Sequence, residues 1–443
     1  DEARENLLRV TGRRGINGSL LAGWLLSIGQ KQAAKEVLEV LDCQEALPML
    51  WRASLSDDAN KRQRLIAEAE RCHPQKVRFP NTLDEVQMLQ TLSDSAFARY
   101  LLGCLWYSKR RYEEAVSCWR ETLAKSPDYA PAHRLLGVYA WNKQQDAAQA
   151  LAYLQRAVEL EPENARFLFE LDFLQKSLGT PVNERLEKLA ARKSVVLKRD
   201  DLTAELLSLW NASGHYADAA AILGTRVFHP WEGGEGKITG QYLLNQLHRA
   251  LQFIEREAFT QAADCLKDAL RYPDNLGEGR LPGQTDNDIW YLLGYCTEQA
   301  GDAQQAEEYY QLALQGGSTL DAGRYYNDQP ADYLFWQGIA LRKSGNPAQA
   351  EQHFQNFITW AGQHRDDVPQ ADFFAVSLPD LVVLDVSAQQ QHQQHCLFIE
   401  ALGHLGLGNV SASQQAMQRL LQLNPAHDKA HLIRHALQSG IFS

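Results

Sequence analysis

Apolar and small residues recur at helical spacing along most of the chain, and the pattern is clearest between Asp288 and Gln315. The spacing there predicts two amphipathic helices, each with one face that must be buried. Gly301 lies between them and suits the left-handed conformation that ends many helices. The residues predicted on the two buried faces are Trp290, Leu293 and Gly294, and then Ala306, Tyr310 and Ala313.

Small and large side chains alternate in this segment as two closely packed antiparallel helices require. Gly294 and Ala306 are small where the helices approach, whereas Trp290 and Tyr310 fill the gaps between helices. This arrangement matches the signature of the tetratricopeptide repeat, a helix–turn–helix unit of 34 residues. One such unit cannot bury its apolar face alone, so its neighbours must share the pattern.

Weaker copies of the pattern extend in both directions, and a chain of 443 residues is too long for one ordinary core. We therefore predict an all-α fold, a right-handed tetratricopeptide-repeat superhelix. Residues 1–95 form degenerate helical repeats, 96–228 regular repeats, and 229–443 repeats with four inserted loops and a final capping helix. The glycines that mark the copies are Gly29, Gly103, Gly137, Gly179, Gly214, Gly338, Gly345 and Gly408.

The four long connections cover residues 229–240, 275–287, 316–331 and 363 to about 386. Each follows the second helix of a repeat, so we expect them to lie side by side along one edge of the array. Loops of this length are usually functional or disordered, and these are too aromatic for disorder. Their candidate ligand or docking residues are Trp231, Glu232, Glu235, Lys237, Tyr325, Tyr326, Asn327, Asp328, Asp332, Asp372 and Phe373.

Two interpretations of these loops remain open. Aromatic faces beside carboxylates and an amide suit the stacking of a sugar ring and hydrogen bonds to its hydroxyls. Glu232 and Glu235 could then form an acid/base pair of the kind that glycosidases use. In the other interpretation, which we favour, the loops pack on one another or on a further domain, with Trp231 and Phe373 as anchors.

A second candidate site is the concave groove lined by the first helices of the repeats. This face is aromatic and poor in cations, which argues against a clamp for acidic peptide C-termini. The groove could hold an extended peptide or another part of the same polypeptide, although each aromatic could equally be a core residue. The groove positions are Tyr100, Tyr107, Trp141, Tyr291, Tyr295 and Phe335.

Composition narrows the range of partners. The chain has 44 basic and 55 acidic residues, and its net charge of -11 disfavours nucleic acid or an anionic membrane. Seven cysteines without a C-x-x-C pair predict reduced thiols and a cytoplasmic protein. The apolar run at residues 19–28 is too short to span a bilayer. The chain begins at Asp1 and not at a methionine, so we expect a fragment of a longer protein.

We predict no cofactor and no metal. His427, His431 and His435 recur at four-residue spacing, but no Glu or Cys joins them in a known ligand pattern, so a solvated face of the last helix is expected. WEGGEG is neither a dinucleotide-binding nor a Walker motif, and the chain has no G-x-S-x-G elbow. Catalytic residues are unknown, and we expect no enzyme activity from this chain alone.

Three loop segments resemble a bacterial family: WEGGEGK (231–237), YYNDQPAD (325–332) and DFFAVSLPDL (372–381). The chain is similar to the C-terminal, repeat-bearing half of YphG-like tetratricopeptide proteins, most strongly from about residue 200 onward. In that family an N-terminal domain of unknown function, rich in β-structure, precedes the repeats, and the genes tend to accompany carbohydrate uptake and catabolism. The resemblance implies that this domain is missing here, and it supplies no catalytic residue.

The sequence therefore predicts a protein-interaction scaffold that docks its own N-terminal domain or another protein in a carbohydrate-utilisation context. The alternative is that the loops form part of a carbohydrate-binding or glycoside-processing site completed by the missing domain. In that case Trp231 and Tyr325 would stack on the sugar, and Glu232 or Glu235 would act as acid or base. Convergence of Trp231, the two glutamates, Asp328 and Asp372 on an open polar pocket would favour the alternative.

Overall fold

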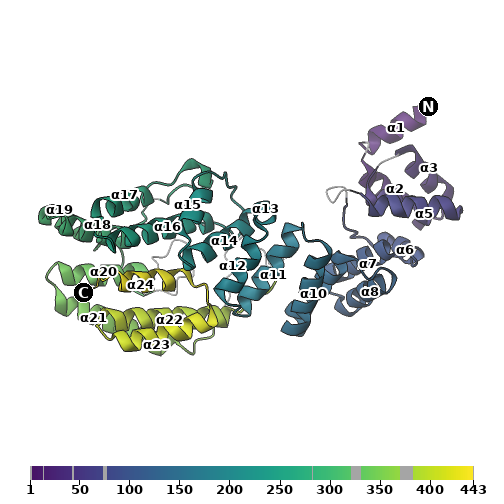
Figure 1. Ribbon diagram of the computed structural model, residues 1–443. Helices are drawn as coiled ribbons and strands as arrows, with labels where there is room; N and C mark the ends of the chain where they lie inside the picture. Colours follow the sequence, from purple (N-terminus) through teal and green to yellow (C-terminus); the bar gives the residue numbers. More distant parts are fainter. Residues whose placement is uncertain are drawn as a thin grey trace. The chain divides into compact units, whose positions relative to one another are not determined.

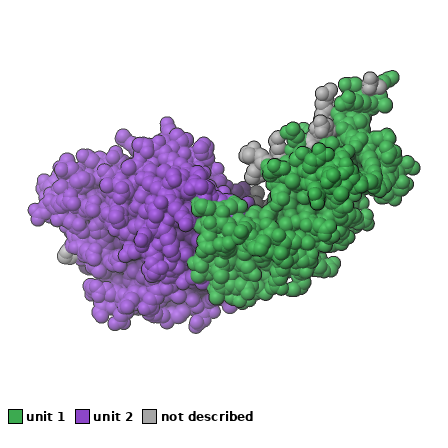
Figure 2. Space-filling view, turned by 45° about the vertical axis from the view of Figure 1, so that its right-hand side comes forward, with its two compact units in different colours: residues 1–162 green, residues 163–443 purple. Residues whose placement is uncertain are grey.

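The computed structural model describes residues 2–12, 14–41, 44–72, 77–281, 283–320, 331–369 and 383–442. Within these ranges all regular structure is helical, and antiparallel helix pairs stack on one another (Figure 1). The chain is a tetratricopeptide-repeat solenoid, as predicted. It divides into two compact units, residues 1–162 and 163–443 (Figure 2). In the part of the chain described, no helix is both long and apolar enough to cross a membrane.

The first unit is built from consecutive helices that pack in pairs. Its helices are α1 (Glu2–Val10), α2 (Gly15–Ser27), α3 (Lys31–Leu41), α4 (Ala46–Ser54), α5 (Ala59–Glu70), α6 (Leu83–Thr91), α7 (Ala96–Ser108), α8 (Tyr112–Lys125), α9 (Ala130–Tyr139), the π-helical turn η2 (Ala140–Gln144) and α10 (Ala147–Leu160). Gly103 on α7 shows why the repeat needs a small residue, because a Cβ there would lie 2.4 Å from Nε1 of the buried Trp119 on α8. The predicted alternation of small and large side chains is thus confirmed in this repeat.

The second unit carries the remaining repeats. Its helices are α11 (Ala165–Ser177), α12 (Val182–Ala190), α13 (Lys193–Val196), α14 (Asp200–Ala212), α15 (Tyr216–Leu223), α16 (Lys237–Ile254), α17 (Phe259–Ala269), the short 3-10 helix η3 (Asp274–Leu276), α18 (Asn287–Gln299), α19 (Ala303–Leu312), α20 (Ala331–Lys343), α21 (Pro347–His364), α22 (Ala388–Gly406), α23 (Val410–Leu423) and α24 (Asp428–Gln438). In the best-defined repeat Gly301 adopts φ +92° between α18 and α19, and a Cβ on Gly294 would lie 2.6 Å from the Tyr310 ring.

The last helix, α24, crosses the stack and packs against α14 and α16 (Figure 1). The residues that follow it reach further along the same surface. The Tyr291 hydroxyl on α18 donates to the Ile441 carbonyl at 3.5 Å, and the Phe442 ring lies 5.4 Å from those of Phe335 and Trp336 on α20. We call the surface that α14, α16, α18 and α20 present to α24 and residues 441–442 the inner groove.

Candidate functional site in the inner groove

The first predicted loop lies between α15 and α16. Trp231 is half-buried, and its indole covers Gly234, where a Cβ would lie 1.9 Å from the ring. Glu232, Glu235 and Lys237 are exposed, and the Glu235 carboxylate accepts a local hydrogen bond from the Gly233 amide at 3.3 Å. The glycine-rich sequence therefore folds back over its own tryptophan and leaves its charged side chains in solvent.

The first two loops lie side by side, as their common place in the repeat predicts. The Phe228 amide donates to the Asn275 carbonyl at 2.8 Å. The Gly236 amide donates to the Glu278 carboxylate at 3.0 and 3.2 Å. Gly277 adopts φ +79° close to Phe228, and a Cβ on this glycine would lie only 2.6 Å from the Phe228 carbonyl oxygen. These contacts join the two loops through one backbone hydrogen bond and through the Glu278 side chain.

Of the other predicted loop residues, one lies at the start of α20 and the rest fall outside the described ranges. Asp332 is buried at the start of α20, where its carboxylate pairs with Lys429 of α24. It belongs to the inner groove. The residues outside the described ranges are Tyr325, Tyr326, Asn327, Asp328, Asp372 and Phe373.

Half of the predicted groove aromatics are buried, and the other half are half-buried. Tyr291 and Phe335 are buried beneath residues 441–442, and Tyr100 is buried with its ring 5.2 Å from that of Tyr129. The half-buried positions are Tyr107, Trp141 and Tyr295. In the second unit the groove holds another part of the same polypeptide, which was one of the occupants considered from the sequence.

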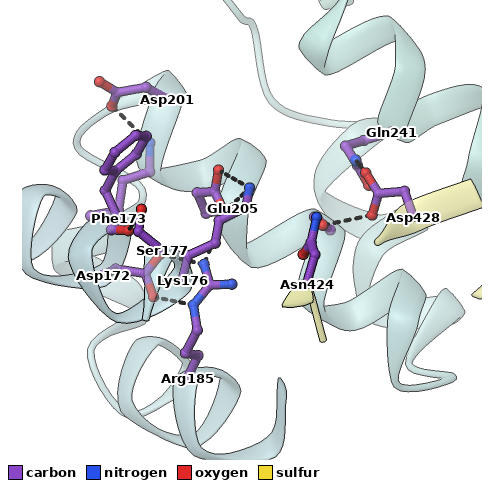
Figure 3. Close-up of polar contacts among 12 residues, drawn as sticks. Asp172, Phe173, Lys176, Ser177, Arg185, Asp201, Glu205, Gln241, Asn424 and Asp428 are labelled. Carbon is purple, nitrogen blue, oxygen red and sulfur yellow. Dashed lines mark hydrogen bonds and ion pairs between the residues drawn. The ribbon is translucent and has the colours of Figure 1, made fainter. Parts of the chain in front are cut away.

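Asp428, the first residue of α24, is held by two neutral side chains of the inner groove (Figure 3). The Ser208 hydroxyl donates to one carboxylate oxygen and the Gln241 amide to the other, each at 2.7 Å. The Asn211 amide donates to the Gln241 oxygen at 3.0 Å, and Asn245 donates to Asn211 at 2.9 Å. This chain of amides fixes Gln241, so α14 and α16 together form a carboxylate clamp without a cation.

Lys429, the next residue, is held by acidic side chains from the opposite part of the groove. Its ammonium lies 2.8 Å from the Asp332 carboxylate. Burial would lower the pKa of Lys429, but Asp332 and Asp288 raise it, so the ammonium stays charged. Burial raises the pKa of Asp288, at the start of α18, to about 6, against the opposing charge of Lys429. The groove thus holds Asp428 and Lys429, an acidic residue followed directly by a basic one.

Three nearly parallel rings, two from the groove and one from α24, form the next contact along the helix. Tyr216 on α15 stacks on His248 of α16 with centroids 4.7 Å apart, and His248 lies 5.2 Å from His435 of α24. The Nδ1 atoms of His248 and His435 are 2.8 Å apart, and Nε2 of His435 lies 3.2 Å from Glu255. The two contacts are satisfied together when neutral His435 donates from Nε2 to Glu255 and accepts at Nδ1 from His248.

Two further histidines of α24 also use a ring nitrogen as an acceptor. The Arg434 guanidinium donates to Nδ1 of His431 at 2.9 Å, and Nε2 of His431 donates to the Pro425 carbonyl at 2.7 Å. His427 caps the helix, because its Nδ1 accepts from the Ala430 amide at 3.1 Å. Both rings must be neutral to make these bonds.

The expectation of a solvated histidine face was therefore wrong. His431 is buried, and His427 and His435 are partly buried, because α24 turns this face into the groove and not to solvent. The residues described contain no group of three His, Cys, Asp or Glu side chains arranged to hold a metal ion. His248, His431 and His435 border an open pocket of about 230 Å³ that is also lined by Tyr216, Glu255 and Arg434.

Burial lowers the pKa of each of these histidines. His248, which is 2% exposed, shifts well below its ordinary value, and the pKa values of His431 and His435 are also lowered. The pKa of His427 falls to about 4, with Asp428 and Asp332 opposing the effect of burial. These histidines therefore bind more protons in the unfolded chain than in the folded chain between about pH 4 and 6.5, and their contribution to stability is lost as the pH falls through this window.

Replacing His427 with asparagine tests this linkage at one residue. Asparagine can cap the helix but does not titrate, so the variant should match the wild type at pH 7.5. At pH 5.0 it should be more stable by on the order of 1–2 kcal/mol, since the protonation penalty is gone. Urea unfolding at both pH values measures the difference. His215→Asn is the matched control, because His215 is also an N-cap residue but makes no side-chain cap hydrogen bond; an equal gain there would contradict the explanation.

A buried ion network supports α14 from the side of α11 and α12 (Figure 3). The Arg185 guanidinium binds both oxygens of Asp172, at 2.9 and 2.6 Å, and also Glu205 at 2.9 Å. Lys176 reaches the same glutamate at 2.9 and 3.0 Å. Burial alone would raise the pKa of Glu205, but the two cations lower it to about 2. Glu205 lies one turn before Ser208, so this network holds the helix that carries the clamp.

Sequence reasoning missed the clamp because it searched the groove for cations. The usable signal was a polar stripe at helical spacing, Gln241, Asn245 and His248, on a helix predicted to face inward. Ser208 and Asn211 form the same kind of stripe one repeat earlier. Polar residues on an inner face indicate that something must satisfy their hydrogen bonds.

Two family models for the tetratricopeptide repeat match parts of the chain. A family model for the tetratricopeptide repeat matches residues 100–165 and 249–325, and a second one matches residues 332–359. A structure of Naa15/Naa10 bound to HypK-THB is similar at 13% identity with a TM-score of 0.32, covering 97% of this chain and 62% of that chain. The human IFIT1 dimer with PPP-AAAA is similar at 16% identity with a TM-score of 0.29, covering 96% and 95%.

The apo form of the quorum sensor NprR from B. thuringiensis gives 12% identity and a TM-score of 0.35, covering 85% of this chain and 97% of that one. This chain spans less than two thirds of the Naa15/Naa10 chain that it matches, at 62%. The matched segments show that the chain carries tetratricopeptide repeats in both of its compact units.

Proposed function

We propose that this protein is an interaction scaffold and that its inner groove binds a helix. The observation that carries the proposal is the docking of α24, in which Asp428 is clamped by Ser208 and Gln241, and Lys429 by Asp332. These contacts select side-chain chemistry at successive positions of the bound helix. Tetratricopeptide repeats commonly recognise protein segments along such a face, and here the chain's own helix is the occupant.

The same proposal extends to the paired loops as a docking surface for a folded partner. The exposed side chains of Glu232, Glu235 and Lys237 lie there, and the hydrogen bonds between the two loops hold the surface together. The resemblance to YphG-like proteins favours the β-rich N-terminal domain of that family, or another protein, as this partner, in a setting of carbohydrate utilisation. Calorimetric titration of that domain into wild-type, Trp231→Ala and Glu232→Ala protein would measure this contact.

Lys429→Glu in the full chain tests the helix-binding groove. The new carboxylate would face Asp332 and Asp288, so we expect α24 to leave the groove at pH 7.5. A fluorescent peptide with the sequence of residues 424–442 should then bind this variant at least tenfold more tightly than the wild type, whose own helix competes. Fluorescence anisotropy measures the affinity, and circular dichroism shows whether the variant is folded.

The peptide provides the specificity control. Asp428→Ala in the peptide removes the group held by the clamp and should weaken binding at least fivefold. Asp428→Ala in the full chain is a second way to loosen α24 should Lys429→Glu fail to fold. A folded variant with α24 released that binds no peptide would refute the proposal.

A further inference from the structure

We infer that α24 is an acid-released occupant of the inner groove: protonation of the histidines at its interface undocks the helix and exposes the groove. The inference rests on the proposed function, because it assigns a regulation to the same groove. It is carried by the hydrogen-bond geometry around four rings, three on α24 and one on α16.

His427, His431 and His435 each contribute an unprotonated nitrogen that accepts a hydrogen bond in the docked state, and His248 of α16 donates to His435 across the interface. In His431 the lone pair of Nδ1 faces the Arg434 guanidinium at 2.9 Å, so a proton there would replace an attraction by a repulsion. In His427 the lone pair accepts from the Ala430 amide, so a proton would remove the N-cap of α24. Acid thus acts on the first and second turns of the helix.

The His248–His435 pair acts on the third turn. One proton can be shared across the contact between the two Nδ1 atoms, because a protonated ring can donate to a neutral one. A second proton would place two N–H groups against each other at 2.8 Å in a buried site. The Tyr216 hydroxyl, 3.3 Å from Nδ1 of His435, would also lose its acceptor.

Some of the charged and titratable groups around the rings favour protonation of the histidines, and others oppose it. Glu255 favours a proton on His435, and Asp428 and Asp332 favour one on His427. Burial opposes protonation at all four rings and is the largest influence on each. The groups that face them are Tyr216 of α15, Glu255 at the end of α16, Asp332 of α20, and Asp428, Lys429 and Arg434 of α24.

The direction of the pH effect depends on whether the docked or the released form of α24 binds protons more tightly. The lowered pKa values describe the docked helix, whereas a released α24 exposes its three histidines to water and returns their pKa values towards 6.5. The released form therefore binds more protons below about pH 6.5, and falling pH shifts the equilibrium towards release.

Amide hydrogen exchange on the full chain measures the release. After correction for the intrinsic pH dependence of exchange, protection of residues 428–438 should fall at least tenfold from pH 7.5 to pH 5.0. Protection of α7 and α8 in the first unit should change less than threefold. Unchanged protection of α24 at pH 5.0 would overturn the inference.

A matched pair of variants assigns the effect to the histidines. His427→Asn, His431→Gln and His435→Gln together should keep α24 protected at pH 5.0, with folding confirmed by circular dichroism. If this triple variant does not fold, His431→Gln alone is tested. It should reduce the fall in the logarithm of the protection factor of α24 between pH 7.5 and pH 5.0 by at least half. The control is His133→Gln in the first unit. The Nε2 atom of His133 contacts the Pro127 carbonyl at 2.8 Å, as Nε2 of His431 contacts the Pro425 carbonyl. An acid response retained in the triple variant would refute the role of these rings.

A peptide separates failure of the regulation from failure of the groove. The peptide has the sequence of residues 424–442 with the same three substitutions, so acid does not change its charge at those positions. If the peptide binds the wild-type chain at pH 5.0 and binds at least tenfold more weakly at pH 7.5, both the helix-binding function and the acid release of α24 are supported. Release of α24 by hydrogen exchange without peptide binding would leave the acid response standing and overturn the helix-binding function. Peptide binding equal at both pH values would overturn the acid response alone.

Discussion

Replacing Arg185 with methionine should destabilise the second unit by about 3–5 kcal/mol. The guanidinium is 1% exposed and is the main partner of Asp172, which is itself 2% exposed. Methionine fills a similar volume but leaves the Asp172 carboxylate in a buried site without its cation. The desolvation cost of that charge is then uncompensated, and this cost, rather than the strength of the original ion pair, sets the size of the effect.

Urea unfolding followed by circular dichroism measures this change, with the transition of the second unit fitted separately because two compact units need not unfold together. Arg156→Met is the matched control. Arg156 also pairs with two carboxylates, Asp128 at 2.7 Å and Glu159 at 3.2 Å, but it is 45% exposed. Its replacement should cost less than about 1 kcal/mol, since water screens the pair. Equal losses in the two variants would show that burial is not the cause.

Replacing Trp119 with alanine should destabilise the first unit by about 3–5 kcal/mol. The indole is 0% exposed and fills the space above Gly103, where the first helix of the repeat has no side chain. Alanine would leave a cavity that the neighbouring helices cannot close, because the small residues that allowed their close approach are already in contact.

The measurement is again urea unfolding, now following the first unit. Trp24→Ala is the matched control, since Trp24 lies in the same unit but is 57% exposed. This change should alter stability by no more than about 0.5 kcal/mol. If Trp119→Ala lowers the free energy of unfolding only slightly, the large residue of the repeat signature is not required for packing, which would contradict the explanation.

The repeat register could be predicted from the sequence because it depends on neighbours in the chain. Gly103 with Trp119, and Gly294 with Tyr310, are close in sequence and meet through the turn between two consecutive helices. The spacing of small, large and turn residues therefore determines their contact almost directly. The adjacency of the first two loops followed from the same regularity.

The contents of the inner groove could not be predicted in this way. Ser208 and Asp428 are separated by 220 residues, and nothing in local spacing indicates that they meet. The same long separation in sequence explains why the histidine face of the last helix was wrongly predicted to be solvated, because a polar helix face at the end of an array is normally solvated. The polar stripes on α14 and α16 indicated an unsatisfied face but did not identify its partner.

The sequence by itself determined the all-helical solenoid, the positions of its turns and the packing within each repeat, because these depend on interactions between residues a few turns apart. Only the tertiary structure decided what the groove holds and the protonation state of the rings that hold it. The superhelix brings the last helix back to α14 and α16, and this return depends on the accumulated geometry of many repeats. Burial in that groove then keeps His248 of α16 and the three histidines of the α24 segment neutral and hydrogen-bonded.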